Sequence, residues 1–115
     1  MNTNKQEKYD EIDDFHEGFA CVRQGDKWGF INQKGEEVIP FIYEDTTYFD
    51  KDYVAVKKDG KWGFINQKGE QIIPFLYDDA SYFSEGLALV MKDDKYGYIN
   101  DKNETVLPFI YDDGA

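Results

Sequence analysis

The sequence has little of what enzymes, metal proteins and membrane proteins need. It contains one cysteine, Cys21, and one histidine, His16, in 115 residues. No intrachain disulfide and no thiolate metal cluster can therefore form. No apolar run approaches the roughly 20 residues that cross a bilayer, and residues 2–7 are polar, unlike a signal segment. As given, the chain is expected to be soluble and cytoplasmic.

Positive charge is also scarce. Lys and Arg number 13 against 24 Asp and Glu, which gives a formal net charge of −11. Nucleic acids and anionic membranes attract clustered basic residues, so binding to either is not expected. A partner with a basic surface would be favoured, although a high net charge more often serves solubility.

What the chain does have is a segment that occurs three times at a fixed spacing. Each copy contains an aromatic residue followed by glycine, at Trp28-Gly29, Trp62-Gly63 and Tyr96-Gly97. The step is 34 residues, since 62 − 28 = 34 and 96 − 62 = 34, and three prolines keep it: Pro40, Pro74 and Pro108. A fixed period of this size indicates a tandem repeat architecture.

The units begin at a tyrosine followed by two acidic residues. This phase predicts a single repeat domain over residues 9–113, with units at 9–42, 43–76 and 77–110 and the start of a further unit at 111–115. Residues 1–8 are polar, and we expect them to form a flexible tail. Since 41% of the residues are hydrophobic and 17% are aromatic, the chain can build a core.

Each unit predicts three antiparallel β-strands. The first lies at 19–23, 53–57 or 87–91, the second is the aromatic-glycine stretch, and the third lies at 38–43, 72–77 or 106–111. Residues such as Asp59-Gly60 between the first two are typical of hairpin turns. The proline within the third strand indicates a bulge, an edge strand or a bend into the next unit, and we favour the bend. Residues 78–83 could form a single helical turn.

The turn after the second strand requires a residue with positive φ. Gly35 and Gly69 occupy that position in the first two units, and Asn103 occupies it in the third. Glycine and asparagine are the residues that enter the left-handed region most easily, so the substitution supports the predicted turn.

One unit alone is too small to bury enough apolar surface to offset its chain entropy. We therefore predict an all-β fold in which three-stranded units stack into a short, curved, solenoid-like array. A closed pseudo-threefold barrel or prism is the alternative. Trp28, Trp62 and Tyr96 are expected to be core residues, and the glycine beside each ring allows another backbone or ring to approach closely.

These features resemble the WG repeat family, which is named for its Trp-Gly pair. The resemblance rests on Lys-Trp-Gly-Phe-Ile-Asn at 27–32 and 61–66, on glycine four residues before valine at 18–22 and 86–90, and on the recurring Ile-Pro and Tyr-acid-acid segments. The third unit departs from the pattern at Tyr96, Tyr98 and Asn103, and the second at Asp52. The resemblance implies a mostly bacterial family of tandem β-rich units that share no catalytic activity and act as scaffolds or interaction surfaces.

Three kinds of candidate site each have a simpler structural explanation. His16 has no counterpart in the other units, and Cys21 aligns with Ala55 and Leu89, so we expect no catalytic pair and no enzyme activity. The acidic pairs lack the loop of a calcium site, so solvated turn carboxylates are favoured over a metal site, and no cofactor is expected. The tryptophans alternate in phase with phenylalanines, which favours a core role over sugar or cation slots between units.

The function predicted from these observations is that of a noncatalytic interaction module that binds a protein. Its contact residues would be tyrosines and acidic residues repeated in each unit: Tyr48, Tyr82, Glu44, Asp45, Asp78 and Asp79. The alternative is a module that binds a carbohydrate or a small cation through aromatic slots between repeats, and a spacer role is a third possibility. The uncapped apolar end at 107–111 predicts either a longer parent array or end-to-end self-association.

Overall fold

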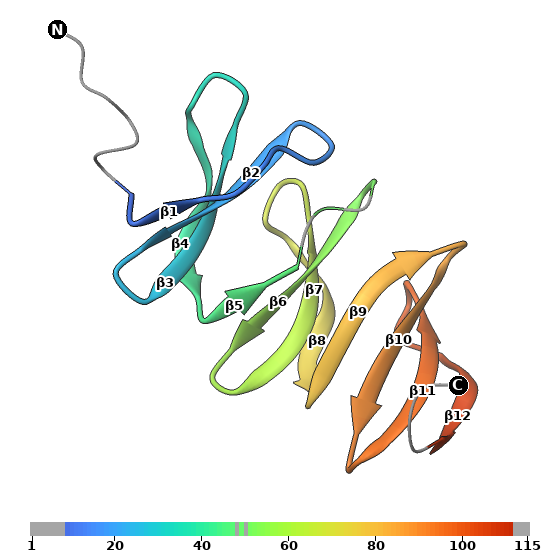
Figure 1. The fold of residues 1–115 in the computed structure, drawn as a ribbon. Helices are drawn as coiled ribbons and strands as arrows, with labels where there is room; N and C mark the ends of the chain where they lie inside the picture. Colours follow the sequence, from blue (N-terminus) through green and yellow to red (C-terminus); the bar gives the residue numbers. More distant parts are fainter. Residues whose placement is uncertain (1–8, 48, 50, 112–115) are drawn as a thin grey trace, which may run out of the picture.

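A computed structural model describes residues 9–47, 49 and 51–111 of the chain. The predicted tail at 1–8, Tyr48 and the residues after 111 lie outside this described part. Within it, the secondary structure consists of β-strands arranged in three antiparallel sheets of four strands each (Figure 1). Every strand pairs with its neighbours in the sequence, so each sheet is a meander.

The strands recur at the repeat spacing. The first sheet consists of β1 (Glu11–Ile12), β2 (Phe19–Gln24), β3 (Lys27–Asn32) and β4 (Glu37–Tyr43). The second consists of β5 (Asp45–Thr46), β6 (Tyr53–Lys58), β7 (Lys61–Asn66) and β8 (Gln71–Tyr77). The third consists of β9 (Asp79–Ser84), β10 (Leu87–Lys92), β11 (Lys95–Asn100) and β12 (Thr105–Tyr111).

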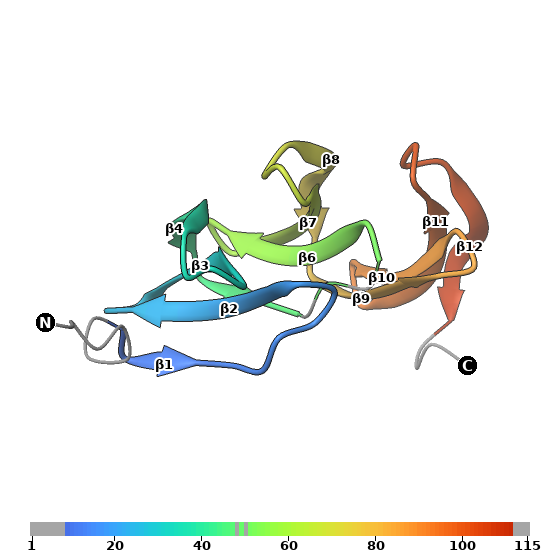
Figure 2. The ribbon, with the colours of Figure 1, turned by 90° about the horizontal axis from the view of Figure 1, so that it is seen from above.

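The three sheets follow one another along the long axis of the molecule, which measures 56 × 25 × 22 Å (Figures 1 and 2). In the described part of the chain, each sheet keeps two open edges and none closes on itself. The all-β class and the tandem array are thus confirmed, and the alternative of a closed barrel or prism is not what the chain forms.

A fourth strand in each sheet corrects the predicted three-stranded unit. The acidic segment that opens each unit forms β1, β5 or β9, and the helical turn predicted at 78–83 is wrong. This segment pairs antiparallel with the next strand, through Glu11↔Arg23, Asp45↔Lys57 and Asp79↔Met91. A single helical turn makes few hydrogen bonds, whereas the free edge of the adjacent strand lets the segment form ladder hydrogen bonds.

The prolines lie in bulges on edge strands. Trp28 pairs with Tyr43 and Phe30 pairs with Ile39, so three residues of β4, including Pro40, lie opposite Gly29. The second sheet repeats this register shift. Because β4 and β8 are edge strands, the missing proline N–H costs no ladder hydrogen bond. The predicted bend between units is therefore wrong, and the bulge and edge-strand alternatives both apply.

The bulge explains the glycine of the Trp-Gly pair. A Cβ atom built on Gly29 would lie 2.7 Å from the carbonyl oxygen of Ile39, and one on Gly63 would lie 2.6 Å from that of Ile73. Real Cβ atoms do not approach oxygen this closely, so only glycine allows the bulged strand to fold over the second strand. The predicted close approach beside the ring is confirmed.

The core lies between consecutive sheets. At the first junction, Cys21, Phe30 and Ile39 of the first sheet cluster with Val54, Val56 and Ile65 of the second. At the second junction, Ala55, Trp62, Phe64 and Ile73 of the second sheet cluster with Ala88, Val90 and Ile99 of the third. The ring-bearing faces of the first and second sheets are therefore each covered by the aliphatic face of the next sheet.

A phenylalanine that precedes the first long strand of each following sheet completes these junctions. The Phe49 ring lies 4.9 Å from that of Phe19 and 5.1 Å from that of Phe30. Phe83 lies likewise 5.1 Å from Tyr53 and 4.7 Å from Phe64, in an edge-on arrangement with the latter. Trp62 is 8% exposed, while Trp28 and Tyr96 are half-buried.

Candidate binding surface

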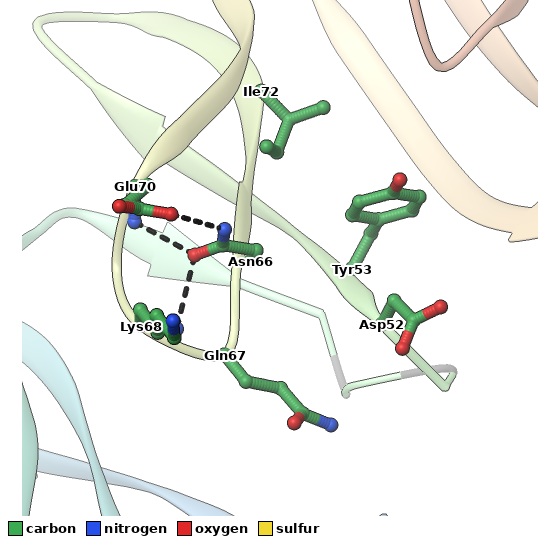
Figure 3. A pocket seen from close by; sticks show the side chains of 7 residues that line it. All are labelled: Asp52, Tyr53, Asn66, Gln67, Lys68, Glu70 and Ile72. Carbon is green, nitrogen blue, oxygen red and sulfur yellow. Dashed lines mark hydrogen bonds between the residues drawn. The ribbon is translucent and has the colours of Figure 1, made fainter.

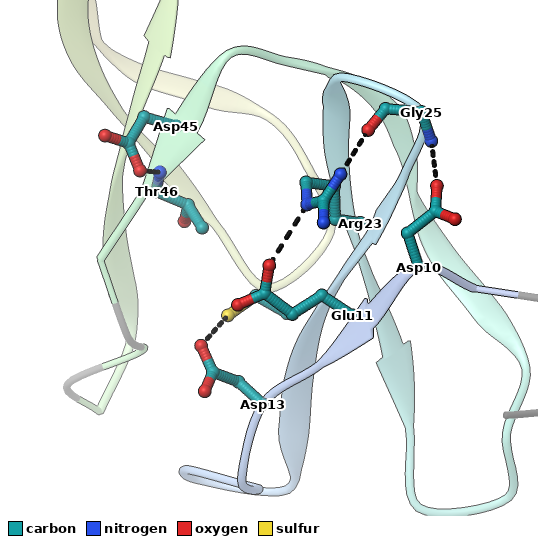
Figure 4. Close-up of polar contacts among 8 residues, drawn as sticks. Asp10, Glu11, Asp13, Arg23, Gly25, Asp45 and Thr46 are labelled. Carbon is teal, nitrogen blue, oxygen red and sulfur yellow. Dashed lines mark hydrogen bonds and ion pairs between the residues drawn. The ribbon is translucent and has the colours of Figure 1, made fainter.

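The first acidic residue of each unit holds the turn of the following hairpin. Asp10 Oδ2 accepts a hydrogen bond from the amide of Gly25 at 2.6 Å (Figure 4). Glu44 accepts from the amides of Asp59 and Gly60 at 2.9 and 3.1 Å. Asp59 and Gly60 have φ values of 54° and 82°, and successive amides in such a turn form a small concavity suited to an anion.

Asp78 repeats this contact in the third unit. It accepts from the amide of Asp93 at 3.0 Å and also forms an ion pair with Lys61 of the second sheet. The hydrogen bond from Lys61 lowers the pKa of Asp78 and raises that of Lys61. Two of the predicted contact residues, Glu44 and Asp78, are thus already engaged within the fold.

The second acidic residue of each pair is exposed on the first strand of its sheet. Asp45 and Asp79 are exposed, and each accepts a hydrogen bond from the next amide, at 2.8 and 2.9 Å. Their counterpart Glu11 forms an exposed ion pair with Arg23 at 3.1 Å (Figure 4). Asp45 and Asp79 belong to different sheets, so they form separate points on the surface and no single cluster.

Of the two predicted tyrosines, Tyr82 lies on the edge strand β9 and is 43% exposed. Tyr48 lies outside the described residues. Neighbouring side chains on a strand point to opposite faces, so Tyr82 points away from the junction in which Phe83 is buried.

A hollow of about 280 Å³ lies where the second and third sheets meet. Tyr53, at the start of β6, and Phe83, at the end of β9, form its aromatic wall. The remaining lining residues are polar or small: Lys51, Asp52, Glu85, Gly86 and Asp101. The hollow therefore combines two rings with three exposed carboxylates.

Tyr53 ties the two sheets together at this point. Its hydroxyl donates a hydrogen bond to Asp101 Oδ2 at 3.2 Å. Burial raises the pKa of Tyr53, and the nearby charge of Asp101 raises it further. The sequence did not single out Tyr53, because Phe19 and Leu87 occupy the same position in the other units. The change from apolar to hydroxyl-bearing residue was the one available signal.

A second hollow, of about 330 Å³, shares Asp52 and Tyr53 with the first. Its opposite side is the turn after β7, where Asn66 Oδ1 accepts from the amides of Lys68 and Glu70 at 3.0 and 2.9 Å (Figure 3). The same clasp recurs at Asn32 and Asn100. The turn closes on φ values of 81°, 81° and 64° at Gly35, Gly69 and Asn103, which confirms the predicted positive φ.

The lone thiol is held in its protonated form. Cys21 is buried, and burial together with a hydrogen bond to Asp13 Oδ2 at 3.4 Å raises the pKa of its thiol to about 12 (Figure 4). A thiol in this state is a poor nucleophile at neutral pH. Among the described residues, no group of three or more His, Cys, Asp and Glu side chains is arranged to hold a metal ion.

The described residues also form no helix that is long and apolar enough to cross a membrane. In comparisons with known proteins, the family described as WG containing repeat matches four consecutive segments, residues 8–28, 28–62, 62–96 and 96–114. These segments cover nearly the whole chain and divide it at the aromatic residue of each aromatic-glycine pair. No curated protein matches the sequence.

Proposed function

Because the chain belongs to the family of WG-containing repeats, we propose that it is a noncatalytic binding module whose partner is a protein with exposed basic side chains. The observation that supports this function best is the hollow between the second and third sheets. It places the paired rings of Tyr53 and Phe83 beside the carboxylates of Asp52, Glu85 and Asp101.

This combination suits a lysine or arginine side chain. The apolar stem of such a side chain packs on aromatic surface while its charge reaches the polar rim. A cation near an aromatic face gains roughly 0.5–1 kcal/mol at an exposed site, and each exposed carboxylate adds a similar amount. One such contact is weak, so a useful affinity requires several contacts along an extended partner.

The rest of the surface supports a basic partner over an acidic one. The net charge of −11 attracts cationic proteins and raises their rate of encounter. Asp45, Asp79 and Tyr82 remain exposed outside the hollow. They would serve as further contacts for a partner that extends along the array.

The experiment is a titration with a blocked arginine-glycine peptide, followed by NMR shifts of backbone amides. The site variant is Glu85→Gln with Asp101→Asn. The control is Asp26→Asn with Asp94→Asn, which removes two exposed turn carboxylates and the same net charge. We expect the site variant to weaken binding by about 3- to 10-fold relative to the control, as the loss of about 0.7–1.4 kcal/mol implies. Equal binding by both variants would mean that only net charge attracts the peptide, and the proposed site would be wrong.

The second hollow favours a carbohydrate as the other candidate ligand. There the Tyr53 ring is accompanied by the Asp52 carboxylate and the Gln67 amide, and a ring with polar groups around it is typical of small-ligand sites. Tyr53→Leu, which installs the residue of the third unit, is the discriminating variant. Binding of a glycan that this variant loses, with no response to the arginine peptide, would favour the carbohydrate function.

A further inference from the structure

One face of the third sheet repeats the two covered faces but remains open. Its residues lie 34 positions after residues of the second sheet that take part in the second junction: Leu87, Leu89, Tyr96, Tyr98 and Leu107. Three of the corresponding residues in the second sheet, Ala55, Phe64 and Ile73, are 0% exposed. In the third sheet, Leu89 and Tyr98 are only half-buried, and Leu107 is 41% exposed. We call the five residues Leu87, Leu89, Tyr96, Tyr98 and Leu107 the open face.

The other half of the same contact is exposed at the first sheet. Phe15 is 45% exposed, whereas its counterparts Phe49 and Phe83 are 4% and 6% exposed. Those two rings are buried because each packs against an aromatic ring of the preceding sheet. No sheet precedes Phe15 among the described residues, so within that part of the chain its ring has no preceding sheet to pack against.

Apart from Phe15, the aliphatic residues of the first sheet that match those of a junction are already buried within the chain. Ala20, Val22 and Ile31 are buried with Tyr9, just as Val54, Val56 and Ile65 are buried with Tyr43. The Tyr9 ring stacks on Phe41 at 5.6 Å, and Tyr43 stacks on Phe75 at 6.3 Å. The first sheet therefore has the shape of a junction partner before any partner is present.

We propose that a second copy of this chain covers the open face. The first sheet of the incoming copy places its Phe15 against Leu87 and Tyr98, in the way that Phe83 is seated against Tyr53 and Phe64 within the chain. The contact is head-to-tail, because the two surfaces differ, and such contacts continue into open chains of molecules unless the rotation closes a ring. This inference does not depend on the proposed peptide site.

Two factors make the association weak. Each copy carries a net charge of −11, so the copies repel one another at low ionic strength, and salt screens that repulsion. By the repeat, residues 111–115 also correspond to residues 9–13 of the incoming copy. In the assembled pair, both segments would compete for the same edge, that of β2 in the incoming copy. One of the two would have to give way, which costs free energy.

The experiment is sedimentation velocity of the full chain from about 10 µM to about 1 mM, a range suited to weak association, at low and high salt. Three variants add the same charge at exposed apolar positions: Phe15→Glu, Leu107→Glu and Leu76→Glu. Leu76 is the control, because it is 47% exposed even though the junction beside its sheet is formed. Circular dichroism establishes that each variant is folded.

We expect the wild-type mass to rise with concentration and with salt, and the Leu76→Glu variant to behave in the same way. Phe15→Glu and Leu107→Glu each remain monomeric alone. Mixed together they form dimers and nothing larger, because one intact surface of each kind remains. A monomeric wild type under all conditions would overturn the proposal. So would association that Phe15→Glu leaves intact, since that would indicate contact between two open faces.

Discussion

At the scale of single residues, the two adjacent acidic residues that open each unit have different roles. The first of each pair accepts amide hydrogen bonds from a hairpin turn about 15 residues further along the chain. The second remains exposed. Composition cannot separate the two roles, because the amides concerned belong to a turn that only the folded sheet brings near. The sequence therefore predicts Glu44, Asp45, Asp78 and Asp79 as one class of contact residue, although Glu44 and Asp78 hold turns within the fold.

Replacing these neighbours one at a time separates the roles. Glu44→Gln removes the charge that two turn amides stabilise, and we expect it to lower the free energy of unfolding by about 1–2 kcal/mol. Asp45→Asn alters an exposed carboxylate and should change stability by less than about 0.5 kcal/mol. Urea denaturation of the two variants at pH 7 measures the difference. Equal losses would mean that the Glu44 carboxylate does not hold the turn.

The buried thiol predicts a dependence of stability on alkaline pH. The pKa of Cys21 is about 12 in the folded chain against an ordinary value of 9.0. Between these values the unfolded chain releases the proton and the folded chain keeps it. The contribution of Cys21 is therefore complete below pH 9 and is lost as pH rises toward 12.

Cys21→Ala, which installs the residue found at the same position of the second unit, tests this dependence. Under reducing conditions, the wild type should lose about 1–2 kcal/mol more stability than the variant between pH 8 and pH 10.5, since one proton contributes at most about 1.4 kcal/mol per pH unit. Guanidinium denaturation at the two pH values gives the result. Parallel losses in the two proteins would show that Cys21 ionises equally in both states.

The glycine of the Trp-Gly pair predicts a steric effect. Gly63→Ala places a Cβ 2.6 Å from the Ile73 carbonyl oxygen and 3.1 Å from the Phe75 ring and the Pro74 backbone, and we expect it to cost about 3 kcal/mol. Gly60→Ala is the control, because that glycine has open space but a φ of 82°, which costs about 1 kcal/mol. Thermal melts compare the two. A smaller loss for Gly63→Ala than for Gly60→Ala would contradict the close approach.

At the scale of elements, the sequence predicts what local chemistry determines. The two hairpin strands of each unit and the positive φ at Gly35, Gly69 and Asn103 follow from turn residues and alternation. The strand at 79–84 could not be predicted in this way, because its acidic, polar composition is typical of loops. It becomes a strand through pairing with β10. The bulge at Pro40 also depends on pairing, since the register with Trp28 shows it and the sequence of the strand alone does not.

The candidate site was predicted less well than the fold for the same reason. Tyr53 and Phe83 come from different units and meet only when two sheets stack. Only its hydroxyl group distinguishes Tyr53 from Phe19, which fills the same position in the first unit. A hollow between repeats forms only where two sheets meet, so the sequence of one unit does not predict it.

The phenylalanine at each junction predicts unequal effects at equivalent positions. Phe83→Ala removes a buried ring that contacts Tyr53 and Phe64, and we expect a loss of about 3–4 kcal/mol. Phe15→Ala removes an exposed ring and should cost less than about 1 kcal/mol in the monomer. Dilute samples in urea provide the comparison. Similar losses would mean that the rings act within their own sheets and that the junctions do not depend on them.

At the scale of the whole molecule, the array owes its stability to contacts between unlike surfaces. A ring-bearing face meets an aliphatic face at each junction, so any number of sheets can be added and the two ends always differ. A single sheet of this size would expose most of its apolar residues. Stability is then a sum of unit and junction terms.

The most direct test of this account is the solvent accessibility of the Trp62 indole, which is 8% exposed at the second junction. Trp28→Tyr leaves Trp62 as the only tryptophan, and tyrosine already occupies the aligned position of the third unit. We predict that acrylamide quenches the emission of Trp62 several-fold less in the folded variant than in guanidinium, and that folding shifts the emission to the blue. Quenching that is equally strong in the folded and unfolded chains would place the indole in water and contradict the account.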